Sequence, residues 1–211
     1  RIGVAVGETP EGPFIPMDKP IEGSFSIDPA VYKDDHGEYY MYFGGIWGGQ
    51  LQRWRDGVFN PSNPTSPTAF LPNDDEHALL PFVAKMSDDL LEFSEKPREV
   101  QILDETGKLL LAGDNERRFF EAAWVHKYNG KYYFSYSTGD THFICYAIGD
   151  NPYGPFTYKG KILNPVVGWT SHHSICEFKG KWYLFYHDSS LSKGVTHLRS
   201  IKIAEIQYDE D

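Results

Sequence analysis

DPAVYKDDHGEYYMYF at residues 28–43 returns as AAWVHKYNGKYYFSY at residues 122–136 and as HSICEFKGKWYLFY at residues 173–186. Each copy has an apolar run, a polar turn that contains glycine, and a run rich in aromatic residues. This order predicts a β-hairpin, because glycine adopts the positive φ that a tight turn requires. Three copies of one hairpin predict a repeat architecture built from antiparallel strands.

A second repeat lies outside these hairpins. VAVGETPEGPF at residues 4–14 matches YAIGDNPYGPF at residues 146–156, and six of the eleven positions are identical. Adding outer strands to each hairpin gives units of about four antiparallel strands, which is the composition of a propeller blade. The predicted outer strands lie at residues 82–86 and 100–103 for the first unit, 143–148 and 156–159 for the second, and 197–206 for the third.

We therefore predict an all-β chain of the β-propeller type, with about three and a half blades in residues 1–211. The first 14 residues supply the half blade, and residues 60–73, rich in Pro and Asn, form a loop insertion. Propellers close with four to eight blades, so we expect a missing segment at the N-terminal end. A β-sandwich is the structural alternative. It explains the strands but not the hairpin that recurs with a matched outer segment.

Composition narrows the range of partners. A chain of 211 residues suffices for one domain with a core, and its aromatic content of 16% fits an all-β fold. The formal net charge of −10 disfavours nucleic acid and anionic membranes, and it is compatible with a neutral sugar. No apolar stretch approaches the roughly 18 residues of a membrane span. Cys145 and Cys176 lie in apolar runs and are expected as buried free thiols.

Three polar residues stand at matching places in the repeat, where each apolar inner strand opens: Asp28, Glu121 and His172. Inner strands line the central channel of a propeller, so these side chains are predicted to converge. Two carboxylates around one pocket suit glycoside hydrolysis, in which one of them must hold a proton. Aromatic neighbours and a second carboxylate both raise the pKa of a carboxylic acid, which favours Glu121 as the acid.

The motifs SIDPAVY at residues 26–32, EAAW at residues 121–124 and SHHSI at residues 171–175 resemble glycoside hydrolase family 43. This resemblance implies a five-bladed propeller and an inverting mechanism. It gives Glu121 the role of general acid and Asp28 that of pKa modulator, whereas the general base is not present in this chain. Inversion requires the base and the acid to be about 6.5–9.5 Å apart, with water between them.

The resemblance also implies binding roles. Arg199 is expected to bind substrate hydroxyls, Trp124 and Trp47 to stack on a sugar face, and Phe120 to line the substrate site. His172 is expected near a calcium ion through water, because calcium prefers oxygen ligands. No organic cofactor is expected, and calcium is a candidate cofactor.

The predicted function is release of xylose or arabinose from plant-wall oligosaccharides by a β-xylosidase or α-L-arabinofuranosidase. Three alternatives remain open at this point: an endo-arabinanase, a glycoside phosphorylase and a carbohydrate-binding propeller without activity. Arg117 and Arg118 directly precede the acid and keep the phosphorylase open, because phosphate binding requires basic residues. The cellular location cannot be read from the sequence.

Overall fold

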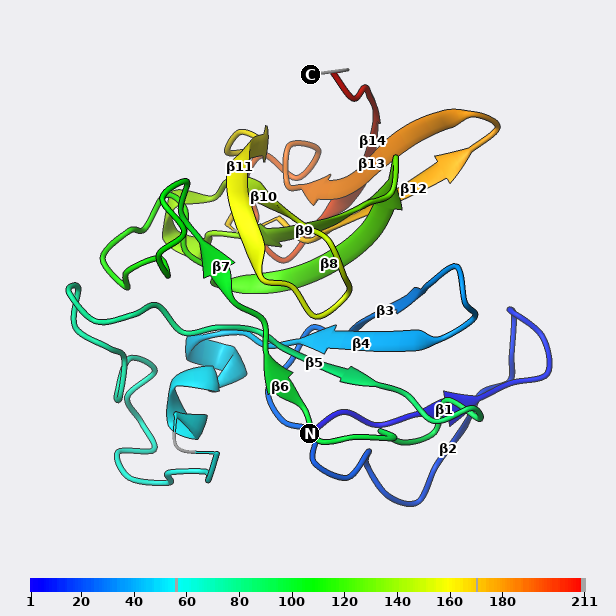
Figure 1. Ribbon diagram of the computed structural model, residues 1–211, viewed down its shortest axis with the longest axis horizontal. Coiled ribbons are helices and arrows are strands. Elements are labelled where there is room, and N and C mark those ends of the chain that lie inside the picture. Colours follow the sequence, from blue (N-terminus) through cyan, green and yellow to red (C-terminus); the bar gives the residue numbers. More distant parts are fainter. Residues whose placement is uncertain (56, 170, 210–211) are drawn as a thin grey trace.

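The computed structural model describes residues 1–55, 57–169 and 171–209. These residues form four antiparallel or mixed β-sheets joined by long loops and three short 3₁₀ helices (Figure 1). Among the described residues, no helix is long and apolar enough to cross a membrane. The prediction of an all-β fold is confirmed.

The first sheet has the strand order β3-β4-β5-β6. Its hairpin pairs β3 with β4 antiparallel in the register Val31↔Met41, on either side of the predicted turn. The outer strand predicted at residues 82–86 is present as β5. The bounds are β3 Ala30–Lys33, β4 Tyr39–Phe43, β5 Phe82–Lys85 and β6 Arg98–Glu99.

The second sheet is the largest and has the order β7-β11-β10-β9-β8. Strands β8 to β11 form the predicted antiparallel unit, and β7 joins its edge in parallel with β11. The bounds are β7 Ile102–Leu103, β8 Glu121–Tyr128, β9 Lys131–Ser137, β10 Ile144–Gly149 and β11 Phe156–Leu163.

One strand assignment from the sequence is wrong. Residues 100–103 were expected to complete the first unit, but β6 fills that place and β7 belongs to the second sheet. Only Arg98 and Glu99 pair with β5. The chain then crosses, so that Ile102 is 1% exposed opposite Phe156. Burial of Ile102 favours this crossing. The segment from β6 to β7 therefore connects the first sheet to the second, and β7 is hydrogen-bonded to β11.

The third sheet has the order β12-β13-β14. Its strands are β12 His173–Phe178, β13 Lys181–Asp188 and β14 Ser200–Ile206. The predicted hairpin is confirmed, and the outer strand begins three residues later than expected. A separate hairpin pairs β1, Ala5–Val6, with β2, Ile15–Pro16. It corresponds to the predicted half blade.

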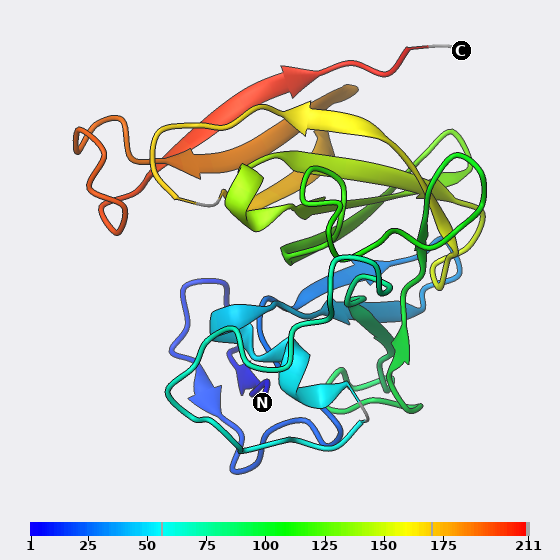
Figure 2. The same ribbon diagram turned by 90° about the vertical axis from the view of Figure 1, so that its left-hand side faces the viewer.

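The three larger sheets follow one another as stacked layers, with the first below, the second in the middle and the third above in Figure 2. Strand β8 contacts β3 and β4 on one side and β12 on the other. The main core fills the joint between the first two sheets with fully buried aromatic side chains, among them Tyr42, Phe43, Phe134, Tyr136 and Phe156. This is the layered arrangement of propeller blades.

The expectation of two buried thiols is half right. Cys145 in β10 is buried, and burial raises the pKa of its thiol to about 11. Cys176 is exposed. It lies on β12 in the third sheet, where β12 also exposes its next two residues, Glu177 and Phe178. An apolar sequence pattern therefore does not ensure that both faces of the strand are buried.

The loop at residues 60–73 contains no strand. Two side chains from the 3₁₀ helix at Leu51–Trp54 hold it in place. Arg53, 4% exposed, donates to the carbonyls of Asn60, Ser62, Asn63 and Ser66, and Gln52 donates to that of Pro67. The insertion is thus anchored, and its end at Leu71 and Pro72 helps to wall a cavity.

Candidate active site

The two acidic segments meet at the start of β8. Asp28 accepts a hydrogen bond through Oδ2 from the backbone N–H of Ala122, at 3.3 Å. Asp28 and Ala122 both have positive φ, 57° and 62°, which is uncommon outside glycine. This contact spans 94 residues and places Asp28 beside the residue that follows Glu121. The repeat positions therefore converge in space, as the sequence predicted.

A β-bulge sets the direction of Glu121. The residue pairs with Ser137 of β9, and the register then shifts before Trp124. Bulges of this kind redirect side chains at strand ends and near active sites. Ala122 and Ala123, inside the bulge, are each 1% exposed. Glu121 thus stands at the start of β8, on a backbone that is held by packing.

A glycine-rich turn holds both acidic segments. The N–H of Ile46 donates to the carbonyl of Phe120 at 3.0 Å. A Cβ at Gly45 would lie 2.7 Å from Ile27 and 3.3 Å from the Cβ of Glu121, so a larger residue at position 45 would displace the backbone or its neighbours. Ser26 accepts from the N–H of Gly45 at 2.9 Å. The absence of a side chain at Gly45 lets the two segments approach.

A polar network extends from Asp28 across the third sheet. His172 Nδ1 lies 4.0 Å from Asp28 Oδ1, and the backbone N–H of His172 donates to Nε2 of His187 at 3.0 Å. Nη1 of Arg199 lies 3.3 Å from the same nitrogen. Burial, followed by the charge of Arg199, lowers the pKa of His187. A lowered pKa favours the neutral ring, whose Nε2 accepts the hydrogen bond from the backbone N–H of His172 and has Arg199 against it.

An aromatic cluster, called the aromatic wall below, includes Phe120, the residue before Glu121. Phe120 is 1% exposed and packs edge-on against Trp47, with ring centroids 5.3 Å apart. Trp169 stacks on Trp47 at 5.8 Å, is 41% exposed, and also contacts His142. Phe120 is thus the buried support of this wall, whereas Trp169 presents an open aromatic face.

The wall depends on another glycine. Gly139 has φ +72°, and a Cβ there would lie 2.2 Å from the ring of Phe120. Trp124 takes no part in the wall. Its indole N–H donates to the carbonyl of Ile175 at 3.1 Å and joins β8 to β12. Of the two tryptophans expected to stack on a sugar, the structure places Trp47 in the wall and Trp124 in the joint between sheets.

The residues available for a metal are few. Among the described residues, no group of three or more His, Cys, Asp and Glu side chains is arranged to hold a metal ion. Calcium takes six to eight oxygen ligands, and near His172 the protein offers the carboxylate of Asp28 and an imidazole. In the part of the chain that the structure describes, these two side chains do not form a calcium cage by themselves.

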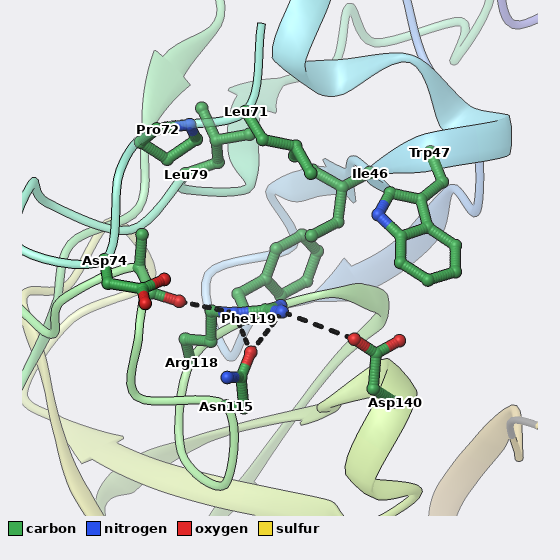
Figure 3. Close-up of a pocket in the computed structure, with 11 residues that line it drawn as sticks. Ile46, Trp47, Leu71, Pro72, Asp74, Leu79, Asn115, Arg118, Phe119 and Asp140 are labelled. Atoms are coloured by element: carbon green, nitrogen blue, oxygen red, sulfur yellow. Dashed lines mark hydrogen bonds and ion pairs between the residues drawn. The ribbon is translucent and has the colours of Figure 1, made fainter. Parts of the chain in front are cut away.

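The two arginines before Glu121 have different surroundings. Arg117 forms ion pairs with Asp114 at 2.6 Å and Glu105 at 3.1 Å. Arg118 is held by Asn115 at 2.7 Å and lies 4.0 Å from Asp140 (Figure 3). Both guanidinium groups therefore have acidic side chains close by. A phosphate group would have to compete with these carboxylates, which weighs against a phosphate cradle.

Three residues of the site were missed by sequence reasoning: Trp169, His187 and His142. His187 ends the third aromatic run, and that position was a usable signal. Trp169 and His142 lie in loops outside the repeat, so no pattern in the sequence pointed to them.

Comparisons with known proteins agree with this geometry. The family model described as glycosyl hydrolases family 43 matches residues 1–211. The chain is 64% identical over 211 residues to a xylosidase/arabinosidase of Bacteroides ovatus and 61% identical to a β-xylosidase of Xylanibacter ruminicola. All of the chain is covered in both, and it spans 63% and 64% of their lengths.

Solved structures give the same result. The β-xylosidase/α-arabinofuranosidase CoXyl43 from a compost metagenome, a calcium-free form with xylotriose, superimposes with a TM-score of 0.94 at 64% identity. It matches 99% of this chain and 62% of its own. A Xanthomonas citri enzyme complexed with xylose has a TM-score of 0.93 at 57% identity, with 99% and 61% covered. The chain, with its propeller layers and converging acidic segments, belongs to glycosyl hydrolase family 43.

Proposed function

We propose that the protein of which this chain is part hydrolyses pentosides, releasing xylose or arabinose from plant-wall oligosaccharides with inversion. The observation that carries this proposal is the contact of Asp28 with the backbone beside Glu121. The names of the relatives support the substrate class. The chain covers about 63% of the first of them, so activity is proposed for the whole protein.

Glu121 is proposed as the general acid that protonates the leaving oxygen. Its backbone is fixed by the bulge in β8 and by the turn at Gly45. The preceding residue, Phe120, is buried. A positioned acid of this kind contributes about 10²–10⁴ in rate.

Asp28 is proposed as the modulator. Its Oδ2 is occupied by the N–H of Ala122, which suits a carboxylate acceptor. A negative charge close to a carboxylic acid makes loss of the acid's proton more costly. Asp28 thereby keeps Glu121 protonated and orients the segment that carries it. We assign the base that activates water to no residue of this chain.

The substrate-binding roles follow the arrangement of the side chains. Arg199, held by the ring of His187, is proposed to donate to sugar hydroxyls, and Trp47 to contact a sugar face. Phe120 is proposed to support Trp47 by packing against its ring. Trp124 is proposed to act indirectly, through the hydrogen bond that joins β8 to β12. Calcium, if bound near His172, would be held mainly by water and would supply positive charge beside Asp28.

The test is hydrolysis of nitrophenyl β-xyloside and nitrophenyl α-arabinofuranoside by the full reading frame. Glu121→Gln should lower kcat by roughly 10²–10⁴-fold, because amide nitrogen cannot replace the acid. The matched control is Glu116→Gln, since Glu116 is exposed and pairs with Lys161. Equal activity of Glu121→Gln and the parent would remove the assignment of the acid.

The same assay separates the alternative functions. A phosphorylase requires phosphate for turnover, whereas a hydrolase does not. The acidic partners of Arg117 and Arg118 support the hydrolase. A parent that binds the sugars but releases no pentose would instead indicate a binding propeller.

A further inference from the structure

The candidate site spans the joint between the second and third sheets. Glu121 opens β8 of the second sheet, whereas His172 directly precedes β12 and Arg199 directly precedes β14 of the third. The two sheets are adjacent layers (Figure 2), and among the described residues no strand of one pairs with a strand of the other. The position of His172 and Arg199 relative to Glu121 therefore depends on side chains that cross the joint.

Two of the side-chain hydrogen bonds across this joint have the same form. Nε2 of His173 on β12 lies 2.6 Å from Oγ of Ser135 on β9. Nε2 of His126 on β8 lies 2.5 Å from the hydroxyl oxygen of Tyr208, which follows β14. In both histidines Nδ1 is buried and has no hydrogen-bond partner among the described residues. We call the contact of His173 the inner bond and that of His126 the outer bond.

Both bonds join a neutral ring to a hydroxyl group. Burial lowers the pKa of His126 to about 4 and that of His173 to about 3, so neither ring is charged at pH 7. Loss of a partner hydroxyl leaves a second ring nitrogen unsatisfied in each case. Deleting the hydroxyl of the inner bond and that of the outer bond therefore gives a matched pair of changes.

The inner bond is close to the candidate site at both of its ends. His173 directly follows His172, whose Nδ1 lies 4.0 Å from Oδ1 of Asp28. Ser135 is fully buried, and it lies two residues before the position of β9 that pairs with Glu121. The inner bond thus connects the strand pair that carries the proposed acid to the start of β12.

A shift at the start of β12 would reach the proposed substrate-binding arginine. The backbone N–H of His172 donates to Nε2 of His187 at 3.0 Å, and Nη1 of Arg199 lies 3.3 Å from the same nitrogen. The first residues of β12 therefore influence the place of Arg199 as well as that of His172.

The outer bond is further from the site. His126 pairs with Tyr133, two residues before Ser135 on β9. Tyr208 stacks on Tyr128, the last residue of β8, with ring centroids 3.7 Å apart. The outer bond thus fastens the segment after β14 to the far end of β8, and neither of its residues adjoins a candidate site residue in the sequence.

We propose that Ser135 and His173 are positioning residues, whose hydrogen bond holds the start of β12 so that His172 stays beside Asp28 and Arg199 faces the substrate. The proposal rests on the proposed glycosidase function for the reaction that this position serves. A misplacement of about 1 Å can cost about 100-fold in rate. The outer bond stabilises the joint without setting the geometry of the site.

The experiment compares Ser135→Ala with Tyr208→Phe in the full reading frame, on nitrophenyl β-xyloside. Each variant removes one hydroxyl from a buried histidine, so we expect comparable falls in melting temperature. In Ser135→Ala we expect kcat/KM to fall about 10-fold with a rise in KM, whereas Tyr208→Phe should match the parent in both constants. Loss of folded protein alone would lower the apparent kcat and leave KM unchanged.

A conservative change at the other partner adds a rescue test. The amide of His173→Gln can still bond the hydroxyl of Ser135, whereas the side chain of His173→Leu cannot. We expect His173→Gln to keep a KM near that of the parent and His173→Leu to resemble Ser135→Ala. If Ser135→Ala does not fold, Ser135→Cys replaces it, because a thiol is a weak donor.

Two measurements make the positioning role testable without turnover. Xylotriose should bind more weakly to Glu121→Gln when Ser135→Ala is added, and equally well when Tyr208→Phe is added, even if the parent proves to hydrolyse nothing. An active parent whose KM and binding are unchanged by Ser135→Ala overturns the positioning role and leaves the glycosidase proposal in place. Equal losses in the two variants also overturn it, as does a crystal structure of Ser135→Ala in which His172 keeps its place beside Asp28.

Discussion

The second and third sheets are built from the same repeated unit, but the side chains of the second sheet are more deeply buried. In β9, Tyr136 and Ser137 are fully buried, whereas the matching Tyr186 and His187 of β13 are half-buried. Strand β8 is packed on both sides, by β3 and by β12. On β14, Ile201 is 79% exposed. The hairpin pattern thus determines the local strand pairing, and the neighbouring layers determine the burial.

This difference separates two chemical roles. The covered sheet carries Glu121 on a rigid strand, next to a dry aromatic support. The open sheet carries the network of His172, His187 and Arg199, with its side chains partly in water. A proton donor, the role proposed for Glu121, benefits from the first setting, and hydroxyl recognition, the role proposed for Arg199, benefits from the second.

Truncation of matched tyrosines gives the largest expected effect. Tyr136→Ala should destabilise the protein by about 4 kcal/mol, because it leaves a cavity in a filled core. Tyr186→Ala should cost about 1–2 kcal/mol, since its site can refill with water. Denaturant unfolding with a common m-value measures both. Equal losses would show that β13 is as well covered as β9.

The matching residues at the strand openings come next. Asp28→Asn should lower kcat/KM about 100-fold, and His172→Gln about 10-fold. Without the charge of Asp28 the acid loses its proton more readily, so the alkaline limb of the pH–rate profile should move to lower pH. A reduced rate with an unmoved limb would point to a purely structural role for Asp28.

Two histidines at the joint between the sheets provide a pH test. Burial lowers the pKa of His126 to about 4 and that of His173 to about 3. His126 bonds Tyr208 at 2.5 Å and His173 bonds Ser135 at 2.6 Å. Below pH 6.5 the unfolded chain takes up protons that the folded chain refuses, so stability should fall by about 2 kcal/mol per histidine between pH 7 and 5.

His126→Asn should flatten that pH dependence by about half, as measured by thermal unfolding at pH 7 and pH 5. The control is His36→Asn in the exposed β3–β4 turn, which should leave the slope unchanged. A slope that stays the same in His126→Asn would mean that the joint between the sheets tolerates the charged ring.

The smallest effect is expected on the open face. Ile203 is 60% exposed, whereas Ile144 of β10 is fully buried. Ile203→Thr should change stability by no more than about 0.5 kcal/mol, and Ile144→Thr should cost well over 1 kcal/mol. A large loss for Ile203→Thr in the full reading frame would reveal that another segment covers β14.

Much of the fold follows from the sequence because turns and strand patterns are local. Gly37, Gly130 and Gly180 all have positive φ at the hairpin turns, and all three hairpins pair as expected. The failures are not local. Ile102 pairs with β11 because the folded core buries it there, and the local sequence does not show that core. Cys176 is exposed because no neighbouring layer among the described residues covers it on β12.

The candidate site shows the same division. The convergence of Asp28 with the segments of Glu121 and His172 could be predicted because repetition marks equivalent places in space. Trp169 reaches the wall through a loop that has no counterpart in the repeat, and the partners of Arg118 come from residues 112–115 and from Asp140. Such contacts depend on long-range packing, which one sequence does not encode in a readable pattern.

Gly139 carries a consequence for anyone who wishes to redesign the enzyme. Its backbone touches Phe120 so closely that even a methyl group would push against the ring, and through that ring against Trp47. Libraries that seek new sugar preferences should vary Trp169 and leave position 139 as it is. Substitutions at Gly139 would displace Phe120 and with it the aromatic wall, so we expect most of these variants to misfold.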